Sequence, residues 1–161
     1  MNVFYLDKDP SEAAKFHCDK HVVKMILESA QILCTVINEK AGYQITPYKS
    51  THRHHPCVIW AGESVQNATY VYSLAYYLNQ QFMKRFKHVV NHKSYQMLVD
   101  VSMQNLIIKF LENKTTMSTP PLAMPEYCKM DDPVASYRLY YKLEKQDLLK
   151  YTYVNTPWWL L

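Results

Sequence analysis

Apolar residues recur every three or four positions in four stretches of this chain, which is the spacing of α-helices that bury one face. The first stretch opens at Asp9-Pro10-Ser11-Glu12, with a capping aspartate, a proline at the first helical position and an acidic residue in the first turn. This signal predicts a helix from about residue 10 to about residue 40, with Gly42 ending it. The same periodicity predicts helices over about residues 57–88, 93–113 and 133–150.

The segments between these stretches are expected to be loops. Residues 1–7 are expected to form a short extended segment, residues 43–56 a polar loop and residues 114–130 a proline-rich connection. The tail "YTYVNTPWWLL" is too aromatic for a solvated tail and is expected to pack on the body. With no repeat and no long linker, residues 1–161 are predicted to form a single all-α domain of about four helices.

Composition excludes several classes of protein. The chain has only two glycines, Gly42 and Gly62, so it has no glycine-rich phosphate-binding loop. No apolar run approaches the ~18 residues of a membrane span, and the first residues do not form a signal peptide. The cysteines are widely separated and typical of reduced thiols, so a cytoplasmic protein is expected. They are Cys18, Cys34, Cys57 and Cys128.

Charge and aromatic content permit a polyanionic partner but do not require one. The net charge is +4 with a pI near 8.8, and the chain has 14 tyrosines, five phenylalanines and three tryptophans. Basic side chains attract phosphates, and aromatic faces stack on exposed bases. A nucleic acid would satisfy both properties, whereas a membrane partner is not expected, and the oligomeric state is left open. The alternative is a mildly basic protein with an aromatic core.

The stretch "KFHCDKHVVKMILES" carries the first candidate chemistry. At about 100° per residue, one narrow band opposite the apolar stripe holds His17, His21, Lys24 and Glu28. The simplest interpretation is a solvated face with a Lys24–Glu28 ion pair. The functional interpretation is an acid–base pair, since histidine exchanges protons near neutral pH and a buried glutamate can serve as a general acid.

Metal binding is an alternative for the same histidines. His17 and His21 have the i, i+4 spacing of metal ligands, and "THRHHP" adds three histidines, so zinc or another divalent metal could be held. Cys18 stands where an H-E-x-x-H motif would have its glutamate. The five candidate ligands are His17, His21, His52, His54 and His55. Otherwise no cofactor is expected.

Basic residues elsewhere suggest phosphate contacts. "THRHHP" precedes a predicted helix start, where free backbone N–H groups favour anions. A second cluster ends the predicted helix 57–88, and the alternative for it is a solvated helix end. The candidate nucleic-acid-binding residues are Lys24, Arg53, His54, Lys84, Arg85, Lys87, Trp158 and Trp159.

The order of these features resembles, distantly, the phage-type pyrimidine-dimer DNA glycosylases of the endonuclease V class. The likeness rests on a short N-terminal segment, His21-x6-Glu28 on the first long helix, basic patches and the tail "KYTYVNTPWW". "MNVFYLD" and "HCDKHVVKMILE" are more similar to a group of tailed-phage proteins. That similarity implies an origin, and with it the host-cell cytoplasm as the location, but no activity. Ile26 and Gln31 stand where the glycosylase family has arginines, so the substrate lesion is not carried over.

This resemblance implies a base-excising DNA glycosylase with AP lyase activity. The N-terminal amine of Met1, or of Asn2 after processing, would be the nucleophile and Glu28 the acid–base group, with His21 beside it and His17 on the same face. The rivals are a metal-dependent nuclease or hydrolase built on the histidines and a non-catalytic phage protein that binds nucleic acid or a host protein.

Overall fold

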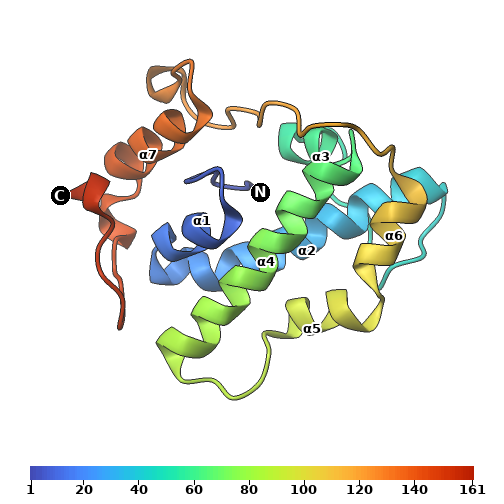
Figure 1. Ribbon diagram of the computed structural model, residues 1–161, viewed down its shortest axis with the longest axis horizontal. Helices are drawn as coiled ribbons and strands as arrows, with labels where there is room; N and C mark the ends of the chain where they lie inside the picture. The colour runs from blue at the N-terminus through green and yellow to red at the C-terminus, as the bar shows by residue number, and fades with distance from the viewer.

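Two long helices that pack across each other, α2 (Asp19–Ala41) and α4 (Val65–Phe86), form the centre of the computed structural model, which describes residues 1–161 (Figure 1). The chain has no strand, so the all-α prediction is confirmed, although seven helices replace the predicted four or so. The other helices are α1 (Pro10–Phe16), α3 (Pro56–Ala61), α5 (Lys93–Asp100), α6 (Met103–Phe110) and α7 (Pro133–Glu144). Single 3-10 turns are η1 (Glu126–Cys128), η2 (Gln146–Leu148) and η3 (Trp158–Leu160).

The helix predicted from residue 10 to residue 40 is interrupted between α1 and α2. His17 adopts an extended backbone (φ −67°, ψ 132°), and the N–H of Asp19 donates to the carbonyl of Lys150 at 2.8 Å. The guanidinium of Arg85 donates to the carbonyls of Lys15 and His17, at 2.8 and 2.7 Å. Because partners from α4 and the tail satisfy these backbone groups, the chain can leave the helix here without burying unpaired polar atoms.

Two further predicted helices are also divided. Between α3 and α4, Ser64 caps the new helix by accepting from the N–H of Asn67 at 3.1 Å, and the Asn67 amide donates to the carbonyl of Trp60 at 2.7 Å. Between α5 and α6, Ser102 takes a left-handed conformation with φ 52°, which ends α5. Periodicity continues across such breaks because both helices of each pair bury apolar faces in the same core.

The N-terminal segment lies in the core rather than along the surface. Val3, Phe4, Tyr5 and Leu6 are all buried, and they belong to the same apolar cluster as α2 and α4. The segment is not a regular extended strand, because Phe4 has a positive φ of 45°. This buried turn brings the first residues of the chain against α2 and beneath α7, to which Phe4 is joined by ring contacts with Tyr137, Tyr140 and Tyr141.

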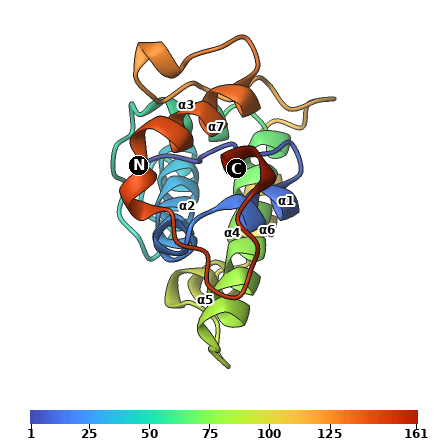
Figure 2. The same ribbon diagram turned by 90° about the vertical axis from the view of Figure 1, so that its left-hand side faces the viewer.

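The C-terminal tail packs on the body, as predicted. After α7 the chain runs down one side of the molecule and turns back on itself (Figure 2). The Tyr151 hydroxyl donates to the carbonyl of Phe16 at 3.0 Å, and Thr152 donates through its N–H and hydroxyl to the carboxylate of Asp19. These bonds tie the tail to the α1–α2 junction. None of the helices combines the length and the apolarity that crossing a bilayer requires.

Candidate functional site

The carboxylate of Glu28 meets the beginning of the chain. Glu28 lies on the third turn of α2 and is only 7% exposed. Its Oε2 lies 3.8 Å from the Met1 α-amine and accepts a 2.8 Å hydrogen bond from the N–H of Asn2. Its Oε1 lies 3.5 Å from the ammonium of Lys24. An amine, a carboxylate and a lysine thus share one partly buried position.

The side chain of Asn2 holds the N-terminal segment in place. Its carbonyl oxygen accepts from the N–H groups of Val3 and Phe4 at 2.7 and 3.1 Å, and its amide donates to the carbonyl of Ala123 at 2.9 Å. The Met1 side chain is 2% exposed although the residue as a whole is half-buried, so the exposed part of Met1 is its main chain, which carries the amine. The terminus is therefore anchored by its side chains.

His21 is part of an aromatic cluster behind the amine. Its Nδ1 is hydrogen-bonded to the Tyr141 hydroxyl, and the Phe4 ring stacks on the imidazole with a centroid distance of 4.5 Å. Burial lowers the pKa of His21 to about 4, and the positive charges of Lys145, Lys24 and Lys20 add to this shift. No hydrogen bond or ion pair joins His21 to Glu28, so the direct pairing expected from the sequence is replaced by contact through the N-terminal segment.

His17 is fully buried and faces the core. Its Nδ1 is 2.7 Å from the carbonyl of Ala13, whereas its Nε2 has no partner. Burial lowers the pKa of His17 to about 3, with His21 and Arg85 adding to the shift. The polar band of the first helix is thus not an open solvated face: His17, His21 and Glu28 are covered, and Lys24 alone of the four is exposed.

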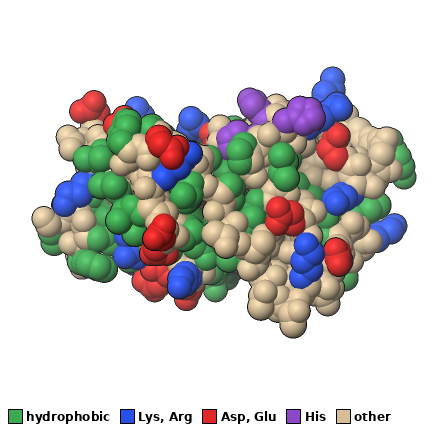
Figure 3. Space-filling model, turned by 90° about the horizontal axis from the view of Figure 1, so that it is seen from above, with side chains coloured by type: hydrophobic (Ala, Val, Ile, Leu, Met, Phe, Trp, Pro, Cys, Tyr) green, Lys and Arg blue, Asp and Glu red, His purple; other side chains and the backbone are tan.

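The loop histidines do not join those of the helix. His52 and His54 are exposed, and His55 caps α3 by accepting from the N–H of Cys57 at 3.1 Å (Figure 3 shows a group of histidines on this surface). Burial lowers the pKa of His55; the charged N-terminus and His52 add to the shift, and Glu28 opposes it. No group of three or more His, Cys, Asp or Glu side chains is arranged to hold a metal ion.

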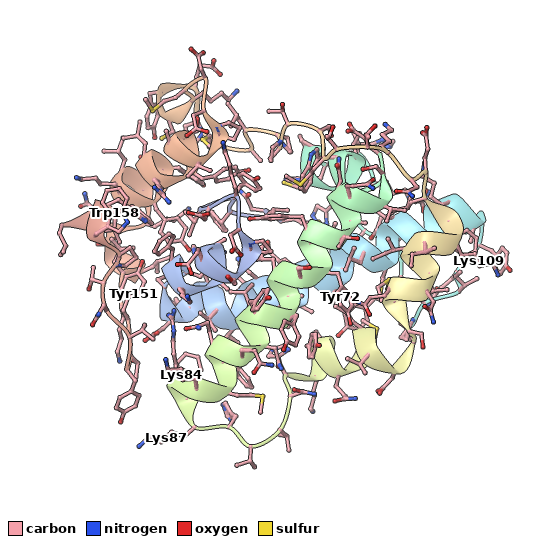
Figure 4. All side chains as sticks on the ribbon, in the orientation of Figure 1. Tyr72, Lys84, Lys87, Lys109, Tyr151 and Trp158 are labelled. Carbon is pink, nitrogen blue, oxygen red and sulfur yellow. The ribbon has the colours of Figure 1, made fainter.

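The predicted phosphate-binding residues separate into free and occupied groups. Lys84 and Lys87 are exposed at the end of α4 (Figure 4), and Arg53 is exposed with its Nε 3.4 Å from Glu39. Arg85, by contrast, is 1% exposed, and its guanidinium donates to Gln81 and Asp19 as well as to two backbone carbonyls. In this structure Arg85 is therefore not available to a phosphate, because its donors hold the α1–α2 junction.

The two tail tryptophans also differ. Trp158 is 69% exposed and lies on the outer side of the molecule (Figure 4). Trp159 packs edge-on against Phe16 and Tyr141 and is half-buried, so its ring serves as packing rather than as a free stacking surface. Of the two candidates for base stacking, Trp158 is the one whose ring is exposed.

Sequence reasoning missed Tyr141 and Arg138. Tyr141 is fully buried and bonds His21, which is 120 residues away in the chain. Arg138 donates to the carbonyl of Leu6 at 3.0 Å and to Asp7 at 2.9 Å, and its guanidinium lies 5.5 Å from the centroid of the Trp158 ring. No local pattern marks either residue, because both act through segments distant in sequence.

No protein-family model, curated protein or solved structure matches this chain. The resemblance to the pyrimidine-dimer glycosylases therefore stays a prediction, and the functional argument depends on the geometry around Glu28.

Proposed function

We propose that this protein is a DNA-acting enzyme of the glycosylase and AP lyase type, with the N-terminal α-amine as its nucleophile and Glu28 as its proton-handling group. The observation that carries the proposal is the 3.8 Å separation between the Met1 amine and Oε2 of Glu28. If Met1 is removed, the nitrogen of Asn2, 2.8 Å from the same oxygen, becomes the α-amine. In either form an amine lies next to the buried carboxylate.

The chemistry needs an amine that loses a proton and a carboxylate that takes it. An α-amine is a weaker base than a lysine side chain, so more of it is neutral and nucleophilic at pH 7. Its lone pair would form a bond to C1′ of the target nucleotide as the C1′–N glycosidic bond breaks and the base leaves with the electron pair. The carboxylate of Glu28 would accept the amine proton and pass it to O4′ as the C1′–O4′ bond opens, so that O4′ becomes a hydroxyl and C1′ the imine carbon. The departing base would take its proton from water.

Strand cleavage would follow from the imine. Removal of a proton from C2′ allows the bond from C3′ to its phosphate oxygen to break, so that the phosphate leaves with the electron pair. Water then hydrolyses the imine and releases the enzyme. Glu28 is the carboxylate closest to this nitrogen among the ion pairs of the structure, and so it is the group we assign to the proton transfers.

The surrounding residues are assigned to positioning. Asn2 bonds the turn that places Met1, while Phe4, stacked on His21, anchors that turn in the core. Because the pKa of His21 is about 4, its imidazole is neutral at pH 7 and serves as a flat, uncharged packing partner. Lys24, exposed and 3.5 Å from Glu28, is placed to attract a DNA phosphate to the amine.

The test is borohydride trapping on DNA that contains an abasic site. We expect a covalent adduct that maps to the N-terminal residue by mass spectrometry and that is lost when the α-amine is acetylated or extended by one residue. Intact mass measurement of the purified protein shows which residue carries the amine.

Glu28→Gln is the diagnostic variant and Glu39→Gln its matched control. Glu39 lies on the same helix, exposed and paired with Arg53, away from the amine. We expect Glu28→Gln to lower the trapping rate by at least about 100-fold, the lower range for loss of a general acid–base group, and Glu39→Gln to match the unmodified protein. Equal trapping by all three proteins, or an adduct on an internal lysine, would contradict the proposal.

A further inference from the structure

A groove runs between the tail and the ends of α1 and α4, on a part of the surface that does not include Met1 or Glu28. Its volume is about 540 Å³, within the range of roughly 300–1,000 Å³ typical of small-molecule sites. Its walls come from three segments that are far apart in sequence. They are formed by Lys15 and Phe16, by Gln81 and Lys84, and by residues 153–158.

Both charged side chains that line this groove are lysines. Lys15 and Lys84 line it and no acidic residue does, although Lys15 is also paired with Glu12. Lys87 lies next to it, with its ammonium 5.0 Å from the centroid of the Tyr153 ring. Lys84 and Lys87 make no ion pair, so their charges are available to an anion from outside.

An exposed aromatic surface forms one side of the groove. Trp158 is 69% exposed, and the guanidinium of Arg138 lies 5.5 Å from its ring centroid. The backing by Arg138, which is itself fixed by Asp7 and by the carbonyl of Leu6, holds the indole in place without covering it. A large, rigid ring that remains exposed is suited to stacking on a planar ligand.

We propose that this groove binds an unpaired DNA strand, with a base stacked on Trp158 and the backbone phosphates at Lys84, Lys87 and Lys15. Tyr151, Trp158, Lys84 and Lys87 all lie along this side of the molecule (Figure 4). Stacking requires the face of a base, which a duplex keeps within its own stack, whereas a single strand offers it freely. The groove therefore selects unpaired over paired DNA.

This inference deepens the proposed function by naming the form of the substrate. The groove is separated from the amine by packed rings, since Trp159 contacts Phe16 and Tyr141, and Tyr141 bonds His21. Strand binding and Schiff-base chemistry are consequently separate properties of the surface, and variants can remove one without the other.

The test is fluorescence anisotropy with labelled oligo-dT, a duplex of equal length and oligo-rU, each over a range of salt concentrations. We expect oligo-dT to bind at least about tenfold more tightly than the duplex. Trp158→Ala should weaken oligo-dT binding about tenfold, the change that loss of one stacked base produces. Lys84→Gln should reduce the slope of log K against log salt by about 0.7, the value for one phosphate contact on a single strand.

Matched controls lie outside the groove. Tyr127→Ala removes another aromatic side chain, 63% exposed, and Lys109→Gln removes a lysine on α6, on the opposite side of the molecule (Figure 4). Both should change oligo-dT binding less than twofold. Far-UV circular dichroism and a thermal melt confirm that Trp158→Ala is folded, and Trp158→Phe, which keeps a ring, should restore most of the affinity.

Several results would overturn the inference: a duplex that binds as tightly as oligo-dT, oligo-rU that binds more tightly than oligo-dT, or controls that lose as much affinity as the groove variants. The Glu28→Gln protein separates the two proposals. If it binds oligo-dT normally but fails to trap abasic DNA, both hold. In the unmodified protein, trapping without single-strand binding would remove only the groove assignment, and single-strand binding without trapping would remove only the Schiff-base mechanism.

Discussion

Acid should destabilise this protein through the two buried histidines of the first-helix band, and removing His17 should abolish about half of that effect. His17 is fully buried and His21 is 6% exposed, and burial lowers their pKa values to about 3 and about 4 from the ordinary 6.5. A histidine with a lowered pKa resists protonation in the folded state but takes a proton readily once unfolded. The stability that such a histidine contributes to the folded state is therefore complete above pH 6.5. It is lost as the pH falls from 6.5 toward the pKa of the histidine in the folded protein.

The magnitude follows from the two pKa values of each group. One unit of difference corresponds to 1.36 kcal/mol, and pH 4.5 lies two units below 6.5 but above the folded-state pKa of each histidine. Each of them should therefore cost roughly 2–3 kcal/mol of unfolding free energy between pH 7 and pH 4.5. Together they amount to about 5 kcal/mol, which is comparable with the whole stability of many domains of this size.

Urea denaturation followed by circular dichroism at pH 7 and pH 4.5 measures this loss directly. The quantity to compare is the change in unfolding free energy between pH 7 and pH 4.5, because a loss of stability that a variant shows equally at both pH values cancels in this difference. His17→Gln replaces the titrating ring with a side chain that can still donate toward the Ala13 carbonyl, the partner of Nδ1. This variant should reduce the change in unfolding free energy between the two pH values by roughly 2–3 kcal/mol. His54→Gln, on an exposed loop, should leave that difference as in the unmodified protein.

One result would refute this reasoning. If His17→Gln and the unmodified protein lose the same free energy to within about 0.5 kcal/mol, the folded state must protonate His17 as easily as the unfolded chain does. The orphaned Nε2 would then be hydrated or paired in solution, and the covered band on α2 would be open to water.

Three further predictions concern the packing that supports the site. Arg85→Met should lower the unfolding free energy, measured by urea denaturation, by about 3–5 kcal/mol because Asp19 and two carbonyls lose a buried partner. The control is its exposed neighbour: Lys84→Met should change the unfolding free energy by less than about 0.5 kcal/mol, and similar losses in both variants would show that the junction does not need the guanidinium. Gly42→Ala should lower the unfolding free energy by about 1 kcal/mol because Gly42 has a left-handed backbone with φ 81°, although no atom lies within 4 Å of the added Cβ. Gly62→Ala, at φ −80°, is the control, and equal losses in the two variants would show that the left-handed backbone of Gly42 is not the cause. All four cysteines are buried, and burial raises the pKa of the Cys57 thiol to about 11. Ellman's reagent should therefore label no cysteine in the folded protein and all four after denaturation, and rapid labelling of the folded protein would contradict this prediction.

Local patterns were enough to predict the helical class and the approximate positions of the helices. The cap at Asp9-Pro10 does begin α1, and Gly42 does end α2 with a left-handed backbone. Helical geometry also placed His21 and Glu28 on one face, because the angle between two residues of the same helix depends only on their separation. These properties arise within a few residues of chain, which is the range over which a sequence can be interpreted without its tertiary contacts.

Interactions between distant segments decided the rest. The polar band of the first helix could have faced water, but distant segments of the chain cover it. Asn2, 26 residues away, is hydrogen-bonded to Glu28, and Tyr141, 120 residues away, is hydrogen-bonded to His21. Arg85 carried the same sequence signal as its neighbour Lys84, yet tertiary packing buried one and exposed the other. The sequence alone determined which residues could share a helical face. Only the folded chain determined which face was removed from water, because burial depends on what packs against a helix and not on the helix itself.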